Sequence, residues 1–585
     1  MNRRHMMASL SGIAALASAN NMTASTLGSS ANSAAQHGAL LSVYDPRKFG
    51  ALGNGRSLDT AAINAAIDAC TKAGGGIVYL FPGNYLCGTL VLKSNVTLYL
   101  EAGATLLGST NIADFGIHLG GSSAIGGKAS AQHLIYAKDA EHIGICGPGR
   151  IDGQGQSYWF LKNPAPAITD HNRWKSAAQW LWDFHDRPSP LVALSHCANV
   201  RIEGVRVENS PGWTILLNRC DKVVVHGIAI KNPVYGPNTD GIDIVGSQNV
   251  MVSDCIIDTG DDAICLKSGE DLDLGGTPSL TRNIVVTNCI ISGCCNGFKI
   301  GTSTFGGFEN ITFSNSVIFN DDVDLASRII SGIALEIVDG GWIDGVVISG
   351  IQMRRARAPI FIRLGDRNRK VHNPARGLRG VLIQGIHATD SIMTSSITGV
   401  PGMPIEDISL SDIHIQSIFP GNKEWVENPV PDSEKQYPEA WMSGWLPASG
   451  LYCRHVNGLE LKDLHFCAPA SEWRSTVLCD DVTRLLLNGL TTTPADRGVP
   501  PLSLTDVRSA WITAAAAPAG ARALLTLQGA QCAEILVSGC DARQASTLAE
   551  VHQNVQPNTL RGEFNICDDP KLHAGATTGI RGKAS

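Results

Sequence analysis

Short runs of alternating apolar and polar residues recur through most of the chain, each followed by Gly, Asn or Asp and then by a second short run. Examples begin at Val200, Val223, Val250 and Ile284, and the pattern continues to Ile535. Such alternation predicts β-strands with one buried face. Gly, Asn and Asp tolerate the left-handed backbone conformation that a bend between strands requires. The predicted bend residues are Gly204, Gly227, Asp254, Asn288, Asn315, Gly350, Gly385, Asp412, Asp463, Gly489 and Gly539.

The spacing of these bends predicts the architecture. Most neighbouring bends lie 23 to 35 residues apart, and each strand is too short to bury its apolar side alone. Stacked coils solve this, because each coil covers the next and extends one core. Leucine-rich repeats would show tighter leucine spacing and an asparagine ladder, and antiparallel folds would show tight Asn-Gly turns. Neither pattern is evident, so we predict an all-β right-handed parallel β-helix (solenoid).

A capping helix is predicted before the first coils. Asp59 is a suitable N-cap for a helix over Thr60–Ala73. Ile63, Ile67 and Cys70 fall on one face of it at helical spacing. Such a helix can cover the first coil, which would otherwise expose its core and strand edges.

The start of the chain resembles an export signal. Arg3 and Arg4 precede a weakly apolar run, and residues 17–19 fit a small-residue cleavage site. Paired arginines before such a run resemble a twin-arginine signal, which carries folded proteins out of a bacterial cytoplasm. Residues 1–19 are therefore predicted to be a signal peptide. We expect the protein to be periplasmic or secreted.

The remaining segments are assigned by composition. Residues 20–40, rich in Ser, Ala and Asn, are expected to be a disordered spacer. Residues 41–568 are predicted to form a single catalytic domain, because the repeat continues without a convincing linker. Residues 569–585 are left as a C-terminal tail.

Composition and charge narrow the possible partners. The 585 residues include 44% hydrophobic and 17% charged residues, with a formal net charge of −7. There is no strong basic run to bind nucleic acid, and no later stretch reaches the roughly 18 apolar residues of a membrane span. The spacing of the cysteines is not that of a metal site. Cys220, Cys255 and Cys289 occupy one point of the repeat, which predicts a buried ladder and leaves disulfides open.

Two aspartate motifs carry the candidate chemistry. The first is Asn238–Asp240 and the second is Gly260–Asp262, about one coil later. Residues one coil apart lie roughly 4.8 Å apart along the stack, so three carboxylates can share one patch. Crowding raises the pKa of one of these carboxyl groups. That group can stay protonated as a general acid, while a charged carboxylate acts on water or the sugar. Lone aspartates more often cap turns, and a turn or supporting role is favoured for Asp243.

At these motifs the chain resembles family 28 of the glycoside hydrolases, the pectin-degrading polygalacturonase family. The resemblance runs from about residue 43 to residue 415. It implies that Asp261 is the general acid, that Asp240 and Asp262 position and deprotonate water, and that the anomeric configuration inverts. Inversion requires carboxyl groups roughly 6.5–9.5 Å apart. No metal or other cofactor is implied. Further shared motifs are Phe49–Gly55, Val96–Ala104, Ile151–Gly155, Asn209–Thr214 and Ser395–Gly402.

Two stretches depart from the family pattern. Asn296 stands at the position of the histidine in the family's Gly-His-Gly turn. Its amide can hydrogen-bond a sugar or an aspartate, but it cannot titrate. The family's Arg-Ile-Lys motif, which grips the galacturonate carboxylate, corresponds to Gly332–Ile337, where Glu336 brings a negative charge. Without that arginine and lysine, binding of a uronate carboxylate needs another cation. Candidate sugar-binding residues are Asn238, Lys267, Asn296, Lys299, Glu336, Arg363 and Arg367.

Two insertions rich in tryptophan, residues 154–190 and 419–447, interrupt the coils. Their aromatic side chains can stack on sugars or anchor the loops by packing. If they close one end of a groove, the enzyme is exo-acting. The leading hypothesis is an exported, exo-acting, galacturonosidase-like hydrolase of a pectic polysaccharide or oligosaccharide.

Two other functions stay open from the sequence. A β-helix polysaccharide lyase needs a calcium-binding carboxylate cluster and a basic residue, a place that Lys267 could fill, although Asn238–Asp240 has no role in it. A non-catalytic carbohydrate-binding β-helix could keep an inactive site in which Asn296 replaced the histidine.

Overall fold

The computed structural model describes residues 42–119, 130–271, 277–367, 377–494 and 497–567. The predicted signal peptide, the spacer and the C-terminal tail lie outside these residues, so the domain boundaries stay predictions. No helix in the described ranges is both long and apolar enough to span a membrane.

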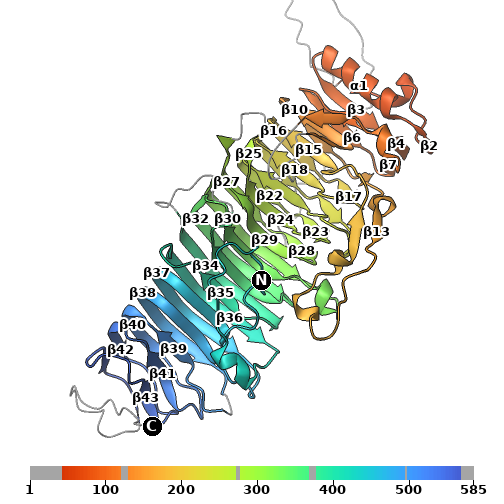
Figure 1. The fold of residues 1–585 in the computed structure, drawn as a ribbon. Helices are drawn as coiled ribbons and strands as arrows, with labels where there is room; N and C mark the ends of the chain where they lie inside the picture. Colours follow the sequence, from red (N-terminus) through yellow and green to blue (C-terminus); the bar gives the residue numbers. More distant parts are fainter. Residues whose placement is uncertain (1–41, 120–129, 272–276, 368–376, 495–496, 568–585) are drawn as a thin grey trace, which may run out of the picture. The chain divides into compact units, whose positions relative to one another are not determined.

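The strands stack as parallel coils (Figure 1). One sheet of 38 strands runs from β1 (Val43–Tyr44) to β44 (Leu560–Glu563), and its strands pair in parallel from coil to coil. The right-handed parallel β-helix predicted from the repeat is confirmed. The column of strands that carries the site is β18 (Ile215–Asn218), β21 (Ile242–Val245), β24 (Ile264–Ser268), β29 (Asn296–Thr304), β31 (Ser331–Ile337) and β33 (Ala358–Leu364).

The core runs through the inside of the coils. Along the site column, one residue from each of five successive strands meets the next in register, and all five are completely buried, which gives each coil a dry contact with its neighbours. These residues are Ile242, Ile264, Phe298, Ile333 and Ile360.

The predicted bend residues are confirmed as left-handed. All eleven have a positive φ, between 49° and 92°. An asparagine ladder is also present, contrary to expectation: Asn283 Nδ2 donates to Asn249 Oδ1 (2.9 Å), and Asn310 Nδ2 donates to Asn283 Oδ1 (3.2 Å). It occupies a second left-handed turn in each coil, at which φ is 55–56°. The repeat pattern did not single out that turn.

The capping helix is present as α1 (Thr60–Lys72), at the end of the stack against β3 (Gly76–Leu80) (Figure 1). Its predicted inner face, Ile63, Ile67 and Cys70, is completely buried. Asp59 is the N-cap residue, as predicted, but its side chain makes no capping hydrogen bond. That carboxylate accepts instead from the backbone N–H groups of residues 52 and 53, at 2.7 and 3.0 Å, and so ties the preceding loop to the helix.

The sixteen cysteines are all free thiols, and most are buried. Cys220, Cys255 and Cys289 are each 1% exposed, but the prediction that they share one point of the repeat is wrong for Cys220. Cys255 and Cys289 precede the paired strands β23 (Ile256–Thr259) and β28 (Ile290–Gly293), whereas Cys220 precedes β19 (Asp221–His226) and lies beside Ser247 of the next coil. Register also places Cys453 beside Cys479 in the next coil.

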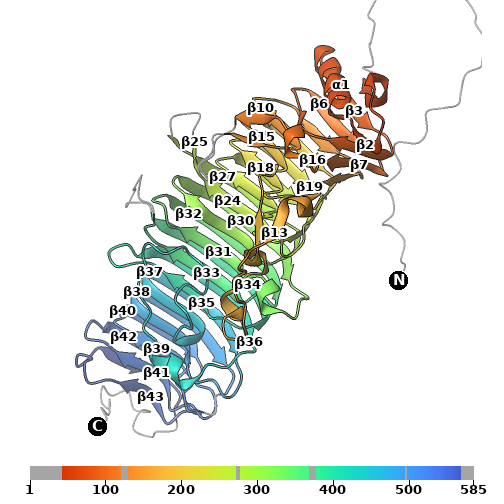
Figure 2. The ribbon, with the colours of Figure 1, turned by 45° about the vertical axis from the view of Figure 1, so that its right-hand side comes forward.

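The two predicted insertions lie outside the coils. The first forms a small antiparallel hairpin of β13 (Trp159–Leu161) and β14 (Trp182–Phe184), which lies over the coils in Figure 2. The second lies between β36 (Ile405–Ser417) and β37 (Ala448–Cys467) and contains one short 3₁₀ helix, η8 (Lys423–Glu427).

Candidate functional site

The three predicted aspartates come together at one edge of the site column. Asp240 precedes β21 and Asp262 precedes β24, and the pairing of these strands sets the two residues side by side. The Gly241 N–H donates to the Asp262 carbonyl (2.9 Å). One carboxylate oxygen from each of Asp240, Asp261 and Asp262 lies within 4.8 Å of the others. The coil spacing thus produces a shared patch of negative charge.

The separation of these oxygens differs from the expectation for an inverting pair. Their spacing of at most 4.8 Å is shorter than the roughly 6.5–9.5 Å between carboxyl groups that leaves room for a water molecule in inverting enzymes. Carboxylate spacing therefore gives no support to inversion, which stays a prediction.

Burial and crowding keep protons on this cluster. Asp240 is 3% exposed, and its Oδ1 has no hydrogen-bond partner in the described part of the chain. Burial, followed by repulsion from Asp261, raises the pKa of Asp240 well above its usual range. Burial and the neighbouring Asp262 also raise the pKa of Asp261. The cluster can therefore hold a protonated carboxyl close to an ionised one.

Asp262 has the neighbours that stabilise a charged carboxylate. Its Oδ1 accepts from the Asn296 side chain (2.7 Å) and from the Asn296 backbone N–H (3.2 Å). Its Oδ2 lies 3.3 Å from the Lys299 ammonium. Asn296, at the position of the family histidine, is thus 2% exposed and contacts the aspartate cluster directly.

Lys299 and Glu336 form a buried ion pair behind Asp262. The Lys299 Nζ lies 3.5 Å from Glu336 Oε2, and the two side chains are 2% and 0% exposed. Burial alone would lower the pKa of Lys299, but the charges of Asp262 and Glu336 raise it well above its usual range. Burial raises the pKa of Glu336 to about 7, although Lys299 opposes that shift. Lys299 therefore faces Asp262 as a cation.

Lys267 and Arg363 do not line the pocket beside the aspartates. The Lys267 Nζ is 3.9 Å from Asp243 Oδ1, and neither side chain lines the pocket described below. Arg363 is 4% exposed and donates to Thr398 Oγ1 (3.3 Å), to the Gly399 carbonyl (3.3 Å) and to the Asp432 carbonyl. Its guanidinium thus holds the second insertion. A sugar contact by Lys267 or Arg363 stays a prediction.

Asn238 lies at the mouth of the cluster. Its Nδ2 donates to Asp261 Oδ2 (3.3 Å), and its Oδ1 accepts from Arg187 Nη2 (3.3 Å). Its backbone N–H donates to Gln179 Oε1 (2.9 Å). The motif analysis missed Gln179 and Arg187. Both belong to the first insertion, and the tryptophan content of that segment was the available signal.

A pocket of about 490 Å³ opens beside Asp261, a volume typical of sites for small ligands. The coils contribute Asn238, Asp261 and Lys299 to its lining. The two insertions contribute residues that include Gln179, Trp180, Trp182, Asp183, Tyr437, Glu439 and Trp441.

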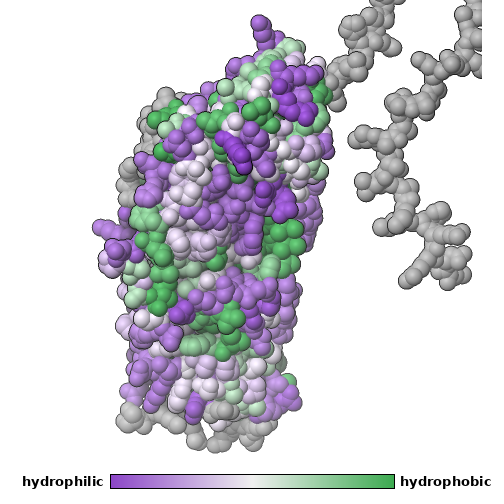
Figure 3. Space-filling view, turned by 90° about the vertical axis from the view of Figure 1, so that its right-hand side faces the viewer, coloured by the Kyte–Doolittle hydropathy of each residue, from purple (hydrophilic) through white to green (hydrophobic). Residues whose placement is uncertain are grey.

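The two insertions meet around this pocket. The rings of Trp174 and Trp445 stack at 4.4 Å, and those of Trp180 and Trp441 meet edge to face at 5.5 Å. Figure 3 shows the side of the coils on which β13 lies in Figure 1, where hydrophobic patches alternate with hydrophilic ones. Burial raises the pKa of Glu439 to about 8, so the second insertion adds another carboxyl group that can hold a proton.

Comparison with known families and proteins gives consistent matches. A family model described as "Glycosyl hydrolases family 28" matches residues 87–434. A "Probable polygalacturonase" of Vitis vinifera is 28% identical over 386 residues, which cover 63% of this chain and 73% of that protein. An "Exo-poly-alpha-D-galacturonosidase" of Dickeya chrysanthemi is 28% identical over 418 residues, which cover 65% of this chain and 67% of that protein.

A solved structure, the exopolygalacturonase of Thermotoga maritima, matches with a TM-score of 0.52 and 23% identity. The match covers 64% of this chain and 87% of that one. At this identity the likeness shows the fold. The matched family segment contains the three aspartates as well as Asn296, Lys299 and Glu336.

Proposed function

The chain belongs to family 28 of the glycosyl hydrolases, and from that premise we propose that it is an exo-acting, galacturonosidase-like enzyme with Asp261 as its general acid. Family membership makes it a glycosidase, an enzyme that hydrolyses O-glycosyl bonds, and implies a pectic substrate. The finer proposal concerns the roles of the residues, the mode of cleavage and the sugar. One observation carries it: three carboxylates within 4.8 Å lie beside a pocket that both insertions enclose.

The roles follow from the different surroundings of the three carboxylates. Asp261 lines the pocket and has a raised pKa, so it can hold the proton that the leaving oxygen needs. Asp262 faces Lys299 and accepts from Asn296, so it is placed to receive the proton of the water molecule. Asp240, beside Asp262, helps to position the water molecule.

The proposed reaction is one displacement at the anomeric carbon. Asp261 gives its proton to the glycosidic oxygen as the bond from that oxygen to the anomeric carbon breaks. The water oxygen bonds to the same carbon from the opposite face, and the water proton passes to Asp262. The products are a free sugar and a shortened chain, and the configuration inverts. Lys299 supplies the positive charge beside the cluster in these steps.

The predicted cation that best fits a uronate is Lys299. It lines the pocket, whereas Lys267 and Arg363 do not. An ammonium group has three donors, so Lys299 can face a sugar carboxylate as well as Asp262 and Glu336. Glu336 would then act through Lys299 rather than touch the sugar.

Exo-action is proposed because aromatic contacts join the two insertions that line the pocket. The Trp174–Trp445 stack and the Trp180–Trp441 contact would block a chain from passing through. We also propose export through the N-terminal signal. N-terminal sequencing of protein recovered outside the cytoplasm would test it, since a new terminus near residue 20 is expected and an intact Met1 would contradict it.

The direct test is a digest of defined pectic oligosaccharides, with the products separated by size through time. We expect one monosaccharide from the first time points, while the oligosaccharide shortens from its non-reducing end. Random internal products would refute exo-action. An unsaturated product that absorbs ultraviolet light and disappears with a chelator would instead indicate a lyase.

A further inference from the structure

The second insertion, which the structure places at residues 418–447, is held at its two ends as well as in its middle, where Arg363 contacts Asp432. It leaves the stack after β36, returns at β37, and lies outside the main sheet. Five of its residues line the pocket. Contacts that fix the ends of the insertion therefore help to place these pocket residues: Gln436, Tyr437, Glu439, Trp441 and Met442.

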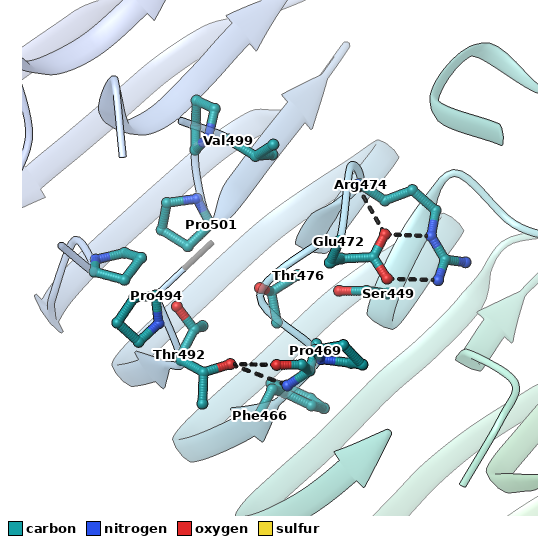
Figure 4. A pocket seen from close by; sticks show the side chains of 14 residues that line it. Ser449, Phe466, Pro469, Glu472, Arg474, Thr476, Thr492, Pro494, Val499 and Pro501 are labelled. Carbon is teal, nitrogen blue, oxygen red and sulfur yellow. Dashed lines mark hydrogen bonds and ion pairs between the residues drawn. The ribbon is translucent and has the colours of Figure 1, made fainter. Parts of the chain in front are cut away.

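Glu472 and Arg474, just before β38 (Ser475–Thr492), pair with each other (Figure 4). Between them they contact both ends of the insertion. The Gly421 N–H donates to Glu472 Oε2 (2.8 Å), and Arg474 Nη1 donates to the Leu446 carbonyl (3.1 Å). Two parallel hydrogen bonds of 2.9 Å join the Arg474 guanidinium to the Glu472 carboxylate. The same guanidinium lies 5.4 Å from the Trp425 ring centroid, inside the insertion.

The pair is buried and well satisfied. Glu472 and Arg474 are 3% and 4% exposed. Glu472 Oε1 also accepts from the backbone N–H groups of Trp473 and Arg474, both at 2.9 Å. A buried ion pair is expensive to desolvate and is weak evidence for a role in stability. Hydrogen bonds that reach both ends of one loop point instead to a role in placing that loop.

The fit at Gly421 supports the same conclusion. A Cβ at this position would lie 2.2 Å from Arg474 Nε and 2.3 Å from Glu472 Oε1, so a larger residue here would displace the pair. The adjoining cavity, lined by Pro469, Pro494 and Pro501 among others, holds about 20 Å³ (Figure 4). That is room for about one water molecule, so the cavity is a poor candidate for a ligand site.

We propose that Glu472 and Arg474 are positioning residues, which clamp residues 418–447 so that the insertion presents its side chains to the substrate. Neither residue lines the pocket. The aspartates stand on the coils, outside the clamped segment. Loss of the clamp should therefore weaken substrate binding and the control of product size much more than it slows the chemical step. This inference rests on the proposed function of the pocket.

The test compares Arg474→Met, Glu472→Gln and Gly421→Ala with Thr493→Val. Thr493 contributes to the same cavity and shares two hydrogen bonds of 3.0 Å with the Ala468 backbone, but not with the insertion. The three clamp variants should raise KM about tenfold, change kcat little and release longer products. Thr493→Val should leave KM and products unchanged, and Arg474→Lys should restore part of the affinity.

A readout that needs no activity separates this inference from the proposed function. Limited proteolysis of the native variants should cut within residues 418–447 in the clamp variants and not in Thr493→Val. If the folded clamp variants keep the wild-type cleavage pattern, KM and products, the inference is wrong. If the wild type hydrolyses no pectic oligosaccharide, the proposed function fails, and proteolysis still decides whether the clamp exists. Gly421→Ala keeps both charges, so it remains informative if Arg474→Met does not fold.

Discussion

At the scale of single residues, three neighbouring aspartates have three different surroundings. Asp240 is buried with an unpartnered oxygen, Asp261 faces the pocket, and Asp262 is held by Asn296 and by Lys299. The sequence motifs were enough to predict that the carboxylates would meet. They could not show which one keeps a proton, because that depends on Lys299, which lies 37 and 38 residues further along the chain.

The first prediction concerns the general acid. Asp261→Asn keeps the shape of the side chain but removes the proton that the leaving oxygen needs, so kcat should fall about 10²–10⁴-fold, with KM less affected. Steady-state kinetics on an oligogalacturonide measures this. Asp183→Asn is the matched control, because Asp183 also lines the pocket but is outside the cluster. Equal losses in both variants would count against the assigned role.

The second prediction concerns pH. The general acid must be protonated, so burial, by raising the pKa of Asp261, extends activity toward higher pH, and activity should fall as pH rises past that pKa. The charge of Lys299 opposes that shift, so Lys299→Met should raise the pKa of Asp261 further and move the alkaline limb of the kcat/KM profile to higher pH. An alkaline limb that keeps its wild-type position would show that Lys299 does not act on Asp261.

At the scale of elements, the bends were predictable and the insertions were not. A residue such as Asn315 or Gly227 is recognised by type and spacing alone, and its φ follows from local geometry. The insertions carry no repeat. Their contacts join residues far apart in the chain, such as Gln179 with Cys295, whose side chains lie 2.9 Å apart. Tryptophan content indicated that a pocket would form but not which side chains would line it.

The third prediction tests a bend. Gly227 has a φ of 62°, and a Cβ there would touch nothing within 4 Å. Gly227→Ala should therefore cost only the left-handed strain, about 1–2 kcal/mol. Gly227→Asn should cost less, because Asn adopts this conformation more readily. Denaturant midpoints at constant slope measure both, and an Ala variant as stable as the wild type would argue against strain at the bend.

At the scale of the whole molecule, the stack provides a rigid platform and the site adds buried carboxyl groups that titrate near neutral pH. Burial raises the pKa of Glu336 to about 7 and that of Glu439 to about 8. The periodic pattern predicted the platform because each coil buries its apolar side chains against its neighbours in the same way. The periodic pattern could not predict the ionisation of the site, because ionisation depends on how the coils and the insertions pack together.

The fourth prediction follows from these carboxyl groups. A carboxyl whose pKa is higher in the folded than in the unfolded state binds more protons when folded, so its ionisation opposes folding. The contribution of these two groups to stability should thus be greatest below the ordinary glutamate pKa of 4.5, and should decline as pH rises toward 7 to 8. Thermal melting of the wild type and of Glu439→Gln measures this, and the variant should show a shallower decline. Parallel curves would show that the ionisation of Glu439 does not change stability.

Proton NMR of an oligogalacturonide digest shows whether this carboxylate cluster hydrolyses a glycosidic bond at the end of a pectic chain. The first spectra report the size and the anomeric form of the new sugar together. We expect a monosaccharide of inverted configuration, and we expect Asp261→Asn to release none. Internal fragments, retained configuration, or undiminished turnover in Asp261→Asn would contradict this expectation.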